Sequence, residues 1–510
     1  MTDIHPVRTA ILALGLATTI SLLTGCGEQA TAANPPAHER APGSTSAPGQ
    51  RDGAAVGAAA PVSAAPTDPP ADRVRILVSG TMLGRLEPCG CASGQLGGLP
   101  RRMQHIAEQR NYDVMLEGGD LVGGTTELDL LKASTALLVL FQMQHAYDAL
   151  GIGRNDLSLP LDEWIAMLGM APGGIVASDL TCKREDWVGL PFVEKTVREQ
   201  RIRIASFTSR LPENTAADSP FEIIPPAKAW ELALAGAAED TLRVLMLHDT
   251  DTVARKLIPG LQPRPDLVIC FDQSYTEPGP HPELVAGVPL VFPGIRGRVL
   301  LALTLTRANQ VPQVGYDLVP LPASKTAPGG GGDPDVKQML LGHRQDVADN
   351  KVLQRMAEQR PTANGAKYLG NASCAGCHQE AMKAWQKSAH AHAWQTLVDG
   401  ENDPKRYGWP VTKYPDCVGC HVVGYGEKTG FVDDRRTRNL WDVGCERCHG
   451  PGSKHAENPA GNVLGLIGGA PASMLCVQCH DFEQSPDFLY GERWPLIEHG
   501  REPHMPPKSK

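Results

Sequence analysis

The chain has 510 residues and a formal net charge of −9, with 42% hydrophobic and 21% charged residues. At roughly 100–200 residues per domain, this length predicts two or three domains, and the hydrophobic share excludes a chain that is disordered throughout. The net negative charge argues against nucleic acid as a partner. Most of the 13 cysteines lie between residues 374 and 479, where they pair as Cys-x-x-Cys.

The N-terminal segment contains an apolar run over residues 9–25, which is short for a membrane span and typical of a signal peptide. The run leads into Leu-Thr-Gly-Cys ending at Cys26, which resembles a bacterial lipobox. The resemblance implies removal of residues 1–25, a lipid on Cys26 and attachment to a membrane through that lipid. Gly27 in place of aspartate favours the outer membrane. The alternative is an ordinary signal peptide with a coincidental cysteine. We expect an exported bacterial lipoprotein, at the outer membrane or facing the periplasm.

Residues 26–72 are dominated by Ala, Pro, Gly, Ser and Thr and show no apolar periodicity. Such a segment cannot bury enough surface to offset the entropy lost on ordering. It is predicted to be a disordered tether with a reach of about 35–40 Å.

Residues 73–325 alternate strand-like apolar runs with helical spacing, which predicts an α/β layered domain. A helix is expected at 99–110. Strands are expected at 74–80, 112–120, 201–207, 241–249, 265–272 and 299–306.

The order of these elements resembles the calcineurin-like metallophosphoesterase domain of periplasmic 5′-nucleotidases. Most positions that would carry metal ligands differ here. Asp120 alone matches clearly, with His248 as a candidate second ligand, and two ligands cannot hold two cations about 3.5–4 Å apart. We therefore expect the fold without the phosphoesterase activity, although an arginine and an asparagine in the altered site could bind an anion. The altered positions are Thr81, Leu83, Gly153-Arg154-Asn155-Asp156 and Cys270-Phe271-Asp272-Gln273.

Three cysteines are placed by this resemblance near the altered metal site. Cys89 and Cys91 follow the first strand as Cys-x-Cys, and Cys270 is expected in another loop of the site. These thiols could bind a metal or take part in redox chemistry, or they could form a disulfide or simply pack. Both interpretations stay open at the level of sequence.

Residues 326–365 join this domain to the last one. A Gly/Pro-rich stretch is followed by a polar amphipathic pattern over 336–360, which predicts a helix. We interpret this segment as a spacer.

The last domain, 366–510, contains four Cys-x-x-Cys-His motifs, the attachment signature of c-type haem. Two thiols add to the two vinyl groups of the porphyrin, and the adjacent histidine binds the iron. Structural zinc or redox disulfides would not require a histidine after every second cysteine. We therefore predict four covalent c-type haems. The attachment residues are Cys374, Cys377, Cys417, Cys420, Cys445, Cys448, Cys476 and Cys479, with proximal ligands His378, His421, His449 and His480.

Further histidines and methionines in this region are candidates for the second axial position of each iron. His390 and His392 lie on a helix predicted over 383–394, where residues two apart point in different directions, so they should not serve the same iron. The other candidates are His455, His499, His504, Met382, Met474 and Met505.

The motif-containing runs at 374–393, 416–426, 444–455 and 476–488 resemble the tetrahaem cytochrome c-554 family. The resemblance covers about residues 366–500 and implies a mainly α-helical fold with closely spaced haems and mostly bis-histidine ligation. It implies His390, His455 and His499 as distal ligands. The second motif, which ends at His421, is then the candidate for a five-coordinate haem. That family moves electrons in periplasmic nitrogen chemistry, a role that need not transfer.

Three functions are compatible with these patterns. The favoured one is a membrane-tethered electron carrier that exchanges electrons with redox partner proteins and is not itself an enzyme. The first alternative is an oxidoreductase that acts on a small nitrogen or sulfur species at a five-coordinate haem. The second is a metal-dependent phosphohydrolase, which the missing ligands disfavour. The sequence does not identify a small-molecule substrate.

Overall fold

The computed structural model describes residues 73–90, 94–142, 147–171, 173–213, 215–308, 311–324, 330–404, 406–460 and 473–500. These residues belong to a compact unit, Thr67–Lys510. Several predictions concern residues outside these ranges. They are the predictions for the signal peptide, Cys26, the tether, Cys91, His504 and Met505. Within the described ranges, no helix is long and apolar enough to cross a membrane.

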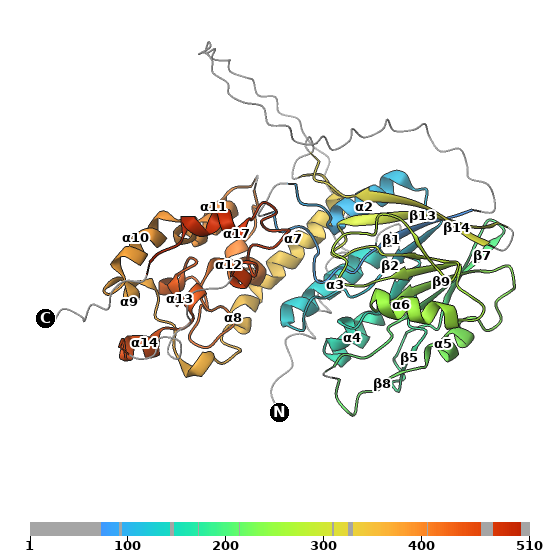
Figure 1. Cartoon of the computed structure of the whole chain (residues 1–510), viewed down its shortest axis with the longest axis horizontal. Helices are drawn as coiled ribbons and strands as arrows, with labels where there is room; N and C mark the ends of the chain where they lie inside the picture. The colour runs from blue at the N-terminus through green and yellow to red at the C-terminus, as the bar shows by residue number, and fades with distance from the viewer. Residues whose placement is uncertain are drawn as a thin grey trace, which may run out of the picture. The chain divides into compact units, whose positions relative to one another are not determined.

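Two mixed six-stranded sheets form the α/β region (Figure 1). In the first sheet β1, β2, β3 and β4 run parallel, and β13 pairs antiparallel with both β1 and β14. Its order is β14 (Val311–Pro320), β13 (Val299–Ala308), β1 (Val74–Ser79), β2 (Val114–Glu117), β3 (Ala149–Gly151) and β4 (Ile175–Val176).

In the second sheet the inner strands β12, β10, β9 and β7 run parallel, and the edge strands β11 and β6 run antiparallel to their neighbours. Its order is β11 (Glu283–Val285), β12 (Val288–Val291), β10 (Leu267–Cys270), β9 (Leu242–Leu247), β7 (Gln200–Phe207) and β6 (Val193–Val197). A separate pair joins β5 (Leu180–Cys182) to β8 (Phe221–Ile223).

The core of the α/β region lies between the two sheets. Alternate residues of β1, such as Ile76 and Val78, share one buried cluster with Ile204 of β7 and Val244 of β9. The opposite face of the second sheet packs on α5 (Pro226–Ala233) and on the residues around α6 (Asp251–Leu257). The predicted α/β layered architecture is therefore confirmed, as are the predicted strands and the helix α2 (Leu99–Gln109). Two further helices are α3 (Glu127–Gln142) and α4 (Leu161–Leu168).

The segment interpreted as a spacer is a packed element. Asp333 caps α7 (Pro334–Asp349) by accepting hydrogen bonds from two backbone N–H groups, and α8 (Val352–Met356) begins after a left-handed residue, Lys351. Val347 joins one buried cluster with Leu128 of α3 and with residues that follow α8. The spacer interpretation was wrong because the apolar face of α7 is buried against α3 and against Tyr414 of the C-terminal region.

The C-terminal region is built from short helices, as predicted for a cytochrome of this kind, and its small core contains Trp394 stacked on Trp441 with ring centroids 5.2 Å apart. The helix predicted over 383–394 is interrupted, because Ser388 is extended and residues 389–392 form a 3₁₀ turn. The helices are α9 (Asn371–Ala375), α10 (Gln379–Lys387), α11 (Ala393–Asn402), α12 (Pro415–His421), α13 (Cys445–His449), α14 (Ser453–Glu457), α16 (Ser473–Cys476) and α17 (Tyr490–Arg493).

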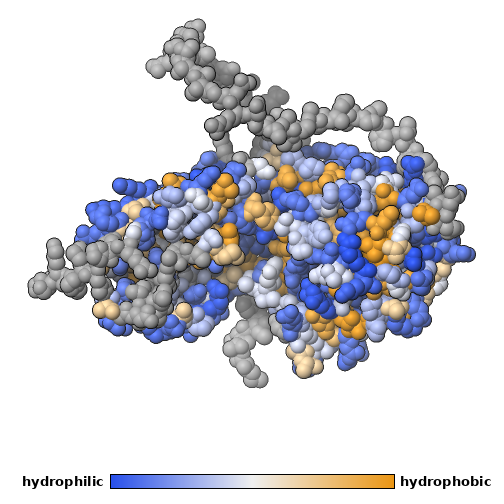
Figure 2. Space-filling model, in the orientation of Figure 1, coloured by the Kyte–Doolittle hydropathy of each residue, from blue (hydrophilic) through white to orange (hydrophobic). Residues whose placement is uncertain are grey.

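The surface view in Figure 2 shows mainly hydrophilic residues, with hydrophobic residues in several separate groups. Exposed large hydrophobic side chains such as Leu284 and Met474 lie in different regions of the chain. Scattered exposure of this kind is normal for a protein surface and does not mark an interface by itself.

Candidate functional site

Each Cys-x-x-Cys-His motif adopts helical turn geometry. The backbone N–H of His378 donates to the carbonyl of Cys374 at 2.9 Å, and that of His480 donates to Cys476 at 2.8 Å. The second and third motifs lie within α12 and α13. Residues three and four apart on a helix share a face. Each motif can therefore present two thiols and one imidazole to one bound group.

Three of the four motif histidines face a second histidine that lies far away in the sequence. The ring centroids are 6.0 Å apart for His378 and His455, 6.1 Å for His480 and His390, and 5.9 Å for His449 and His499. Imidazoles that bind opposite sides of one metal ion, each with a metal–nitrogen distance of about 2 Å, have centroids roughly 6 Å apart. The spacing therefore fits an iron between the two rings of each pair.

These pairs involve the distal residues that the family resemblance implies. The structure also gives a pairing that the sequence leaves open: His455 faces the first motif, His499 the third and His390 the fourth. His392 is exposed, whereas His390 is half-buried.

His421 of the second motif is held differently. Its Nδ1 lies 2.6 Å from the carbonyl oxygen of Ala393, to which it donates, and this leaves Nε2 as the nitrogen that can bind a metal. Among the described residues, His421 belongs to none of the three histidine pairs. Burial lowers the pKa of His421, which favours the neutral, metal-binding form.

His480 of the fourth motif is oriented by the loop that follows it. Its Nδ1 lies 2.9 Å from the hydroxyl oxygen of Ser485, and its ring stacks on Phe488 with centroids 4.6 Å apart. A hydrogen bond at the second ring nitrogen fixes the orientation of a metal-binding histidine and tunes its basicity.

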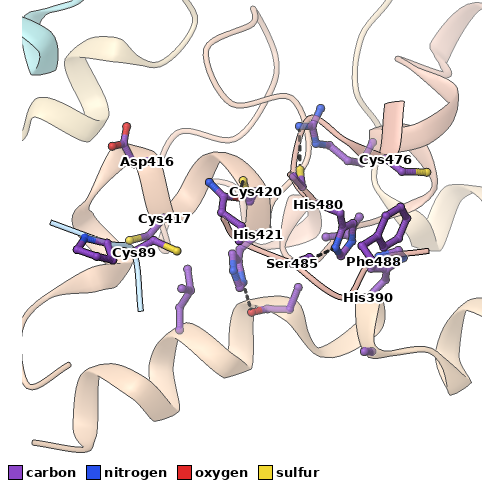
Figure 3. Close-up of a pocket in the computed structure, with 18 of the residues that line it drawn as sticks. Cys89, His390, Asp416, Cys417, Cys420, His421, Cys476, His480, Ser485 and Phe488 are labelled. Carbon is purple, nitrogen blue, oxygen red and sulfur yellow. Dashed lines mark hydrogen bonds between the residues drawn. The ribbon is translucent and has the colours of Figure 1, made fainter. Parts of the chain in front are cut away.

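A cavity of about 840 Å³ lies against the second and fourth motifs (Figure 3). Its wall includes the thiols and imidazoles of both motifs and His390, together with the loop Gly84–Cys89 of the α/β region. A volume of this size is in the range of cofactor sites. The donor set, the spacing of the histidines and the cavity together fit covalently attached haem.

The four motifs adjoin one another in a definite order. The sulfur of Cys374 in the first motif lies beside that of Cys445 in the third, and the sulfur of Cys420 in the second motif lies beside that of Cys479 in the fourth. The third motif lies beside the fourth, because Nη2 of Arg447 is 3.5 Å from the sulfur of Cys479. Neighbouring motifs therefore follow the order one, three, four, two.

The altered metal site of the α/β region is filled by protein groups. The Asp120 carboxylate accepts hydrogen bonds from the backbone N–H of Asn155 at 2.8 Å and from the side-chain amide of Gln273 at 2.7 Å. A Cβ at Gly153 would lie 2.1 Å from that carboxylate, so only glycine fits there. Across the described ranges, no three or more His, Cys, Asp or Glu side chains are grouped to hold a metal ion.

The other predicted residue of this site, His248, is buried against Phe271, with ring centroids 5.0 Å apart. Burial lowers the pKa of His248 to about 3, so it is neutral at physiological pH. Its Nε2 lies 3.3 Å from the Ser206 hydroxyl.

Sequence reasoning missed a buried ion pair at the ends of β1 and β2. Arg102 donates to Glu117 at 2.5 Å, and Ser79 donates to the same carboxylate oxygen at 2.5 Å. The sequence did contain a signal for this pair, because Glu117 is a charged residue at the end of the apolar run that forms β2. A buried charge requires a partner.

The remaining cysteines do not form the predicted common site within the described residues. Cys89 accepts a hydrogen bond from Gln95 at 3.1 Å and lines the cavity beside Cys417. Cys270 was predicted to lie in a loop. It is instead the buried last residue of β10, because the apolar strand continues up to it. Its thiol donates to the carbonyl of Asp249 at 3.2 Å, and burial raises the pKa of that thiol.

Comparisons with known proteins agree with the resemblance in the C-terminal region. Residues 373–450 match the family described as "Cytochrome c554 and c-prime". Cytochrome c-554 of Nitrosomonas europaea is 40% identical over 96 residues, which is 18% of this chain and 41% of that protein. The chain thus spans less than half of that relative. The similarity to cytochrome c-554 is confirmed, and it supports covalently bound c-type haem in this region.

The solved structures similar to the α/β region include phosphoesterases. The 5′-nucleotidase precursor of Thermus thermophilus is 16% identical, with a TM-score of 0.43, over 62% of this chain and 68% of its own. The calcineurin-like phosphoesterase YfkN of Bacillus subtilis is 13% identical, with a TM-score of 0.41, over 54% of this chain and 98% of its own. Identities and TM-scores this low say nothing about the activity of this chain.

Proposed function

We propose that the chain is a c-type cytochrome that transfers electrons through four covalently bound haems. The observation that carries this proposal is the set of three opposed histidine pairs at 5.9–6.1 Å, each of which joins a Cys-x-x-Cys-His motif to a histidine distant in the sequence. The proposed distal ligands are His455, His499 and His390 for the first, third and fourth motifs.

The adjacency of the motifs supports a continuous electron path in the order one, three, four, two. Attachment cysteines of successive motifs in this order lie beside each other, so the edges of the groups they hold would lie close together. The first and second motifs are then the two ends of the path.

The cellular setting is part of the proposal. We infer an exported lipoprotein held at a membrane by a lipid on Cys26, with residues 1–25 as signal peptide and 26–72 as tether. Residues 73–325 form a degenerate phosphoesterase-like domain, 326–365 connect it to the next domain, and 366–510 form the tetrahaem domain. The proposed partners are redox proteins, and nucleic acid is not among them.

A second candidate function is catalysis at the second haem. His421 belongs to none of the described histidine pairs, and its motif lines the cavity of about 840 Å³. A five-coordinate iron there could bind and convert a small nitrogen or sulfur species, which would make the protein an oxidoreductase.

The deciding experiment is a haem count combined with the spin state of the purified ferric protein. We expect four haems per chain, three with low-spin ferric signals and one with a high-spin ferric signal, and we expect the reduced protein to bind one carbon monoxide per chain. The matched variant Cys417→Ala/Cys420→Ala should lose one haem and the high-spin signal together. Fewer than four haems in the wild type would contradict the electron-path proposal, and wholly low-spin signals would contradict the second candidate function.

A further inference from the structure

The three residues that follow His480 are held by arginines of the α/β region. Glu483 pairs with Arg85 and with Arg296, each at 2.9 Å, and Arg296 also lies 3.5 Å from Asp481. The Glu483 side chain is only 10% exposed. Because one carboxylate between two arginines is largely removed from water, this contact is screened less than an ordinary surface ion pair.

The residue between the two acids is held as well. The guanidinium groups of Arg296 and Arg298 lie 5.2 and 5.0 Å from the centre of the Phe482 ring, within the range of cation–π attraction. The side-chain amide of Gln95 donates to the backbone carbonyl of Glu483 at 2.8 Å. The tripeptide Asp481–Glu483 is therefore contacted through its side chains and its backbone.

These contacts come from two loops of the α/β region. Arg85 and Gln95 lie between β1 and α2, where the phosphoesterase resemblance would place the first metal ligands. Arg296 and Arg298 lie between β12 and β13, and Ile295 pairs with Thr81 of the first loop in an isolated bridge. The two loops therefore act together on one segment of the haem region.

The held tripeptide continues directly into the group that orients His480. The Asp481 carboxylate accepts from the backbone N–H groups of Glu483 at 3.0 Å and Gln484 at 2.8 Å. The backbone N–H of Ser485 then donates to the carbonyl of Asp481 at 2.9 Å. This turn places the Ser485 hydroxyl 2.9 Å from Nδ1 of His480.

The second motif lacks this connection. Nδ1 of His421 donates to the backbone carbonyl of Ala393, which is the first residue of α11 in the haem region. The partner of His421 is thus a main-chain group of its own region, whereas the partner of His480 is a side chain on a loop that the α/β region holds.

We propose that the α/β region is a positioning partner of the fourth haem: Arg85 and Arg296, through Glu483 and Asp481, hold Ser485 against His480 and so set the reduction potential of that haem. The proposal rests on the proposed tetrahaem function. Loss of the hydrogen bond at Nδ1 makes a histidine a weaker electron donor to its metal, which favours the reduced iron.

The test is a redox titration of the haem-loaded full chain, with each haem followed by its optical and electron paramagnetic resonance signals. Ser485→Ala should raise the reduction potential of one low-spin haem by up to about 59 mV. For a one-electron reduction, this shift is a tenfold change in the equilibrium constant. Glu483→Gln should raise the same potential by less, with the other three unchanged. In the Ser485→Ala background, Glu483→Gln should add no further shift, because the two residues act in series.

Glu127→Gln is the matched control. It makes the same chemical change in the Arg355–Glu127 ion pair between α8 and α3, which does not touch the 481–485 loop, so all four potentials should stay unchanged. If Glu483→Gln fails to load four haems, Arg85→Met supplies the test. This variant removes one of the two ion pairs of Glu483 and keeps the pair with Arg296. The proposal is overturned if neither variant moves the potential that Ser485→Ala moves, or if the shifts in the double variant add. A wild-type protein with fewer than four haems would instead refute the proposed function.

Discussion

Two histidines two positions apart have different surroundings in this protein. His390 is half-buried with its ring centroid 6.1 Å from that of His480, whereas His392 is exposed. The 3₁₀ turn Ala389–His392 lies between the helices α10 and α11, and it directs the two side chains apart. Of these two histidines, His390 is therefore the one placed to act as the second axial ligand of the proposed fourth haem.

We expect His390→Ala to convert one low-spin haem of the ferric protein into a high-spin haem that binds carbon monoxide when reduced. The physical reason is that His480 would remain as the only axial histidine ligand of that iron. Electron paramagnetic resonance of the purified variant measures this change. His392→Ala is the matched control and should retain the wild-type spectrum, and a loss of low-spin signal in the control instead of in His390→Ala would contradict the assignment.

At the scale of elements, α7 connects the α/β region to the helix of the second haem motif. Thr135 of α3 lies 3.0 Å from Nδ1 of His343, and Nε2 of His343 lies 3.0 Å from the hydroxyl of Tyr414. Thr135 donates its own hydroxyl proton to the carbonyl of Leu131, so it accepts from Nδ1–H, and Tyr414 donates to Nε2. Tyr414 is the N-cap residue of α12.

Tyr414→Phe should destabilise the folded protein by about 1–3 kcal/mol, because it leaves Nε2 of the buried His343 without its donor. Urea unfolding of the haem-loaded protein, followed by circular dichroism, measures the change. Tyr490→Phe, at a partly exposed position, is the control and should stay within about 0.5 kcal/mol of the wild type. Equal stabilities of the two variants would count against the hydrogen-bond chain.

The same histidine predicts how stability depends on pH. Burial lowers the pKa of His343 to about 3, below the value near 6.5 of an unfolded histidine. Between these values the unfolded chain binds the proton and the folded chain does not, so the free energy of unfolding falls as the pH falls. We expect His343→Gln to reduce the slope of stability against pH, measured between pH 5 and 6, by up to about 1.4 kcal/mol per pH unit. Identical slopes in variant and wild type would show that His343 is protonated in the folded state.

At the scale of the whole molecule, loops of the α/β region contact the C-terminal region. The loop between β1 and α2 contributes Gly84–Cys89 to the wall of the cavity and Arg85 to the pair with Glu483. Meanwhile the Asp120 carboxylate is occupied by the amides of Asn155 and Gln273. The loop beside the altered site therefore contacts the segment that follows the fourth motif.

We expect no phosphatase turnover above background when the protein is assayed with p-nitrophenyl phosphate and added Mn²⁺ or Zn²⁺, because amide groups take the place of metal ions at Asp120. Asp120→Ala is the paired variant and should give the same result. Turnover by the wild type that disappears in Asp120→Ala would establish a hydrolytic function for the α/β region.

Much of the fold was predictable because apolar runs long enough to form buried strands carry a strong local signal, as in β1 and β9. The strands β3 and β4 were not predicted, since they have only three and two residues and owe their pairing to neighbours in the sheet. The role of α7 was misjudged for a related reason. Its sequence shows an amphipathic pattern, and only the contacts of Val347 and His343 show that the apolar face packs against both α3 and Tyr414.

The sequence by itself determined which residues are proposed to attach c-type haem, because the attachment chemistry requires two thiols and one imidazole within a single helical turn. It also predicted that most of the metal ligands implied by the phosphoesterase resemblance are absent. Only the tertiary structure decided which distant histidine faces which motif, because His455, His499 and His390 reach their partners through the packing of separate helices. The link from the α/β region to His480 was likewise invisible in the sequence, since Arg85, Arg296 and Glu483 meet only when loops from distant parts of the chain fold together.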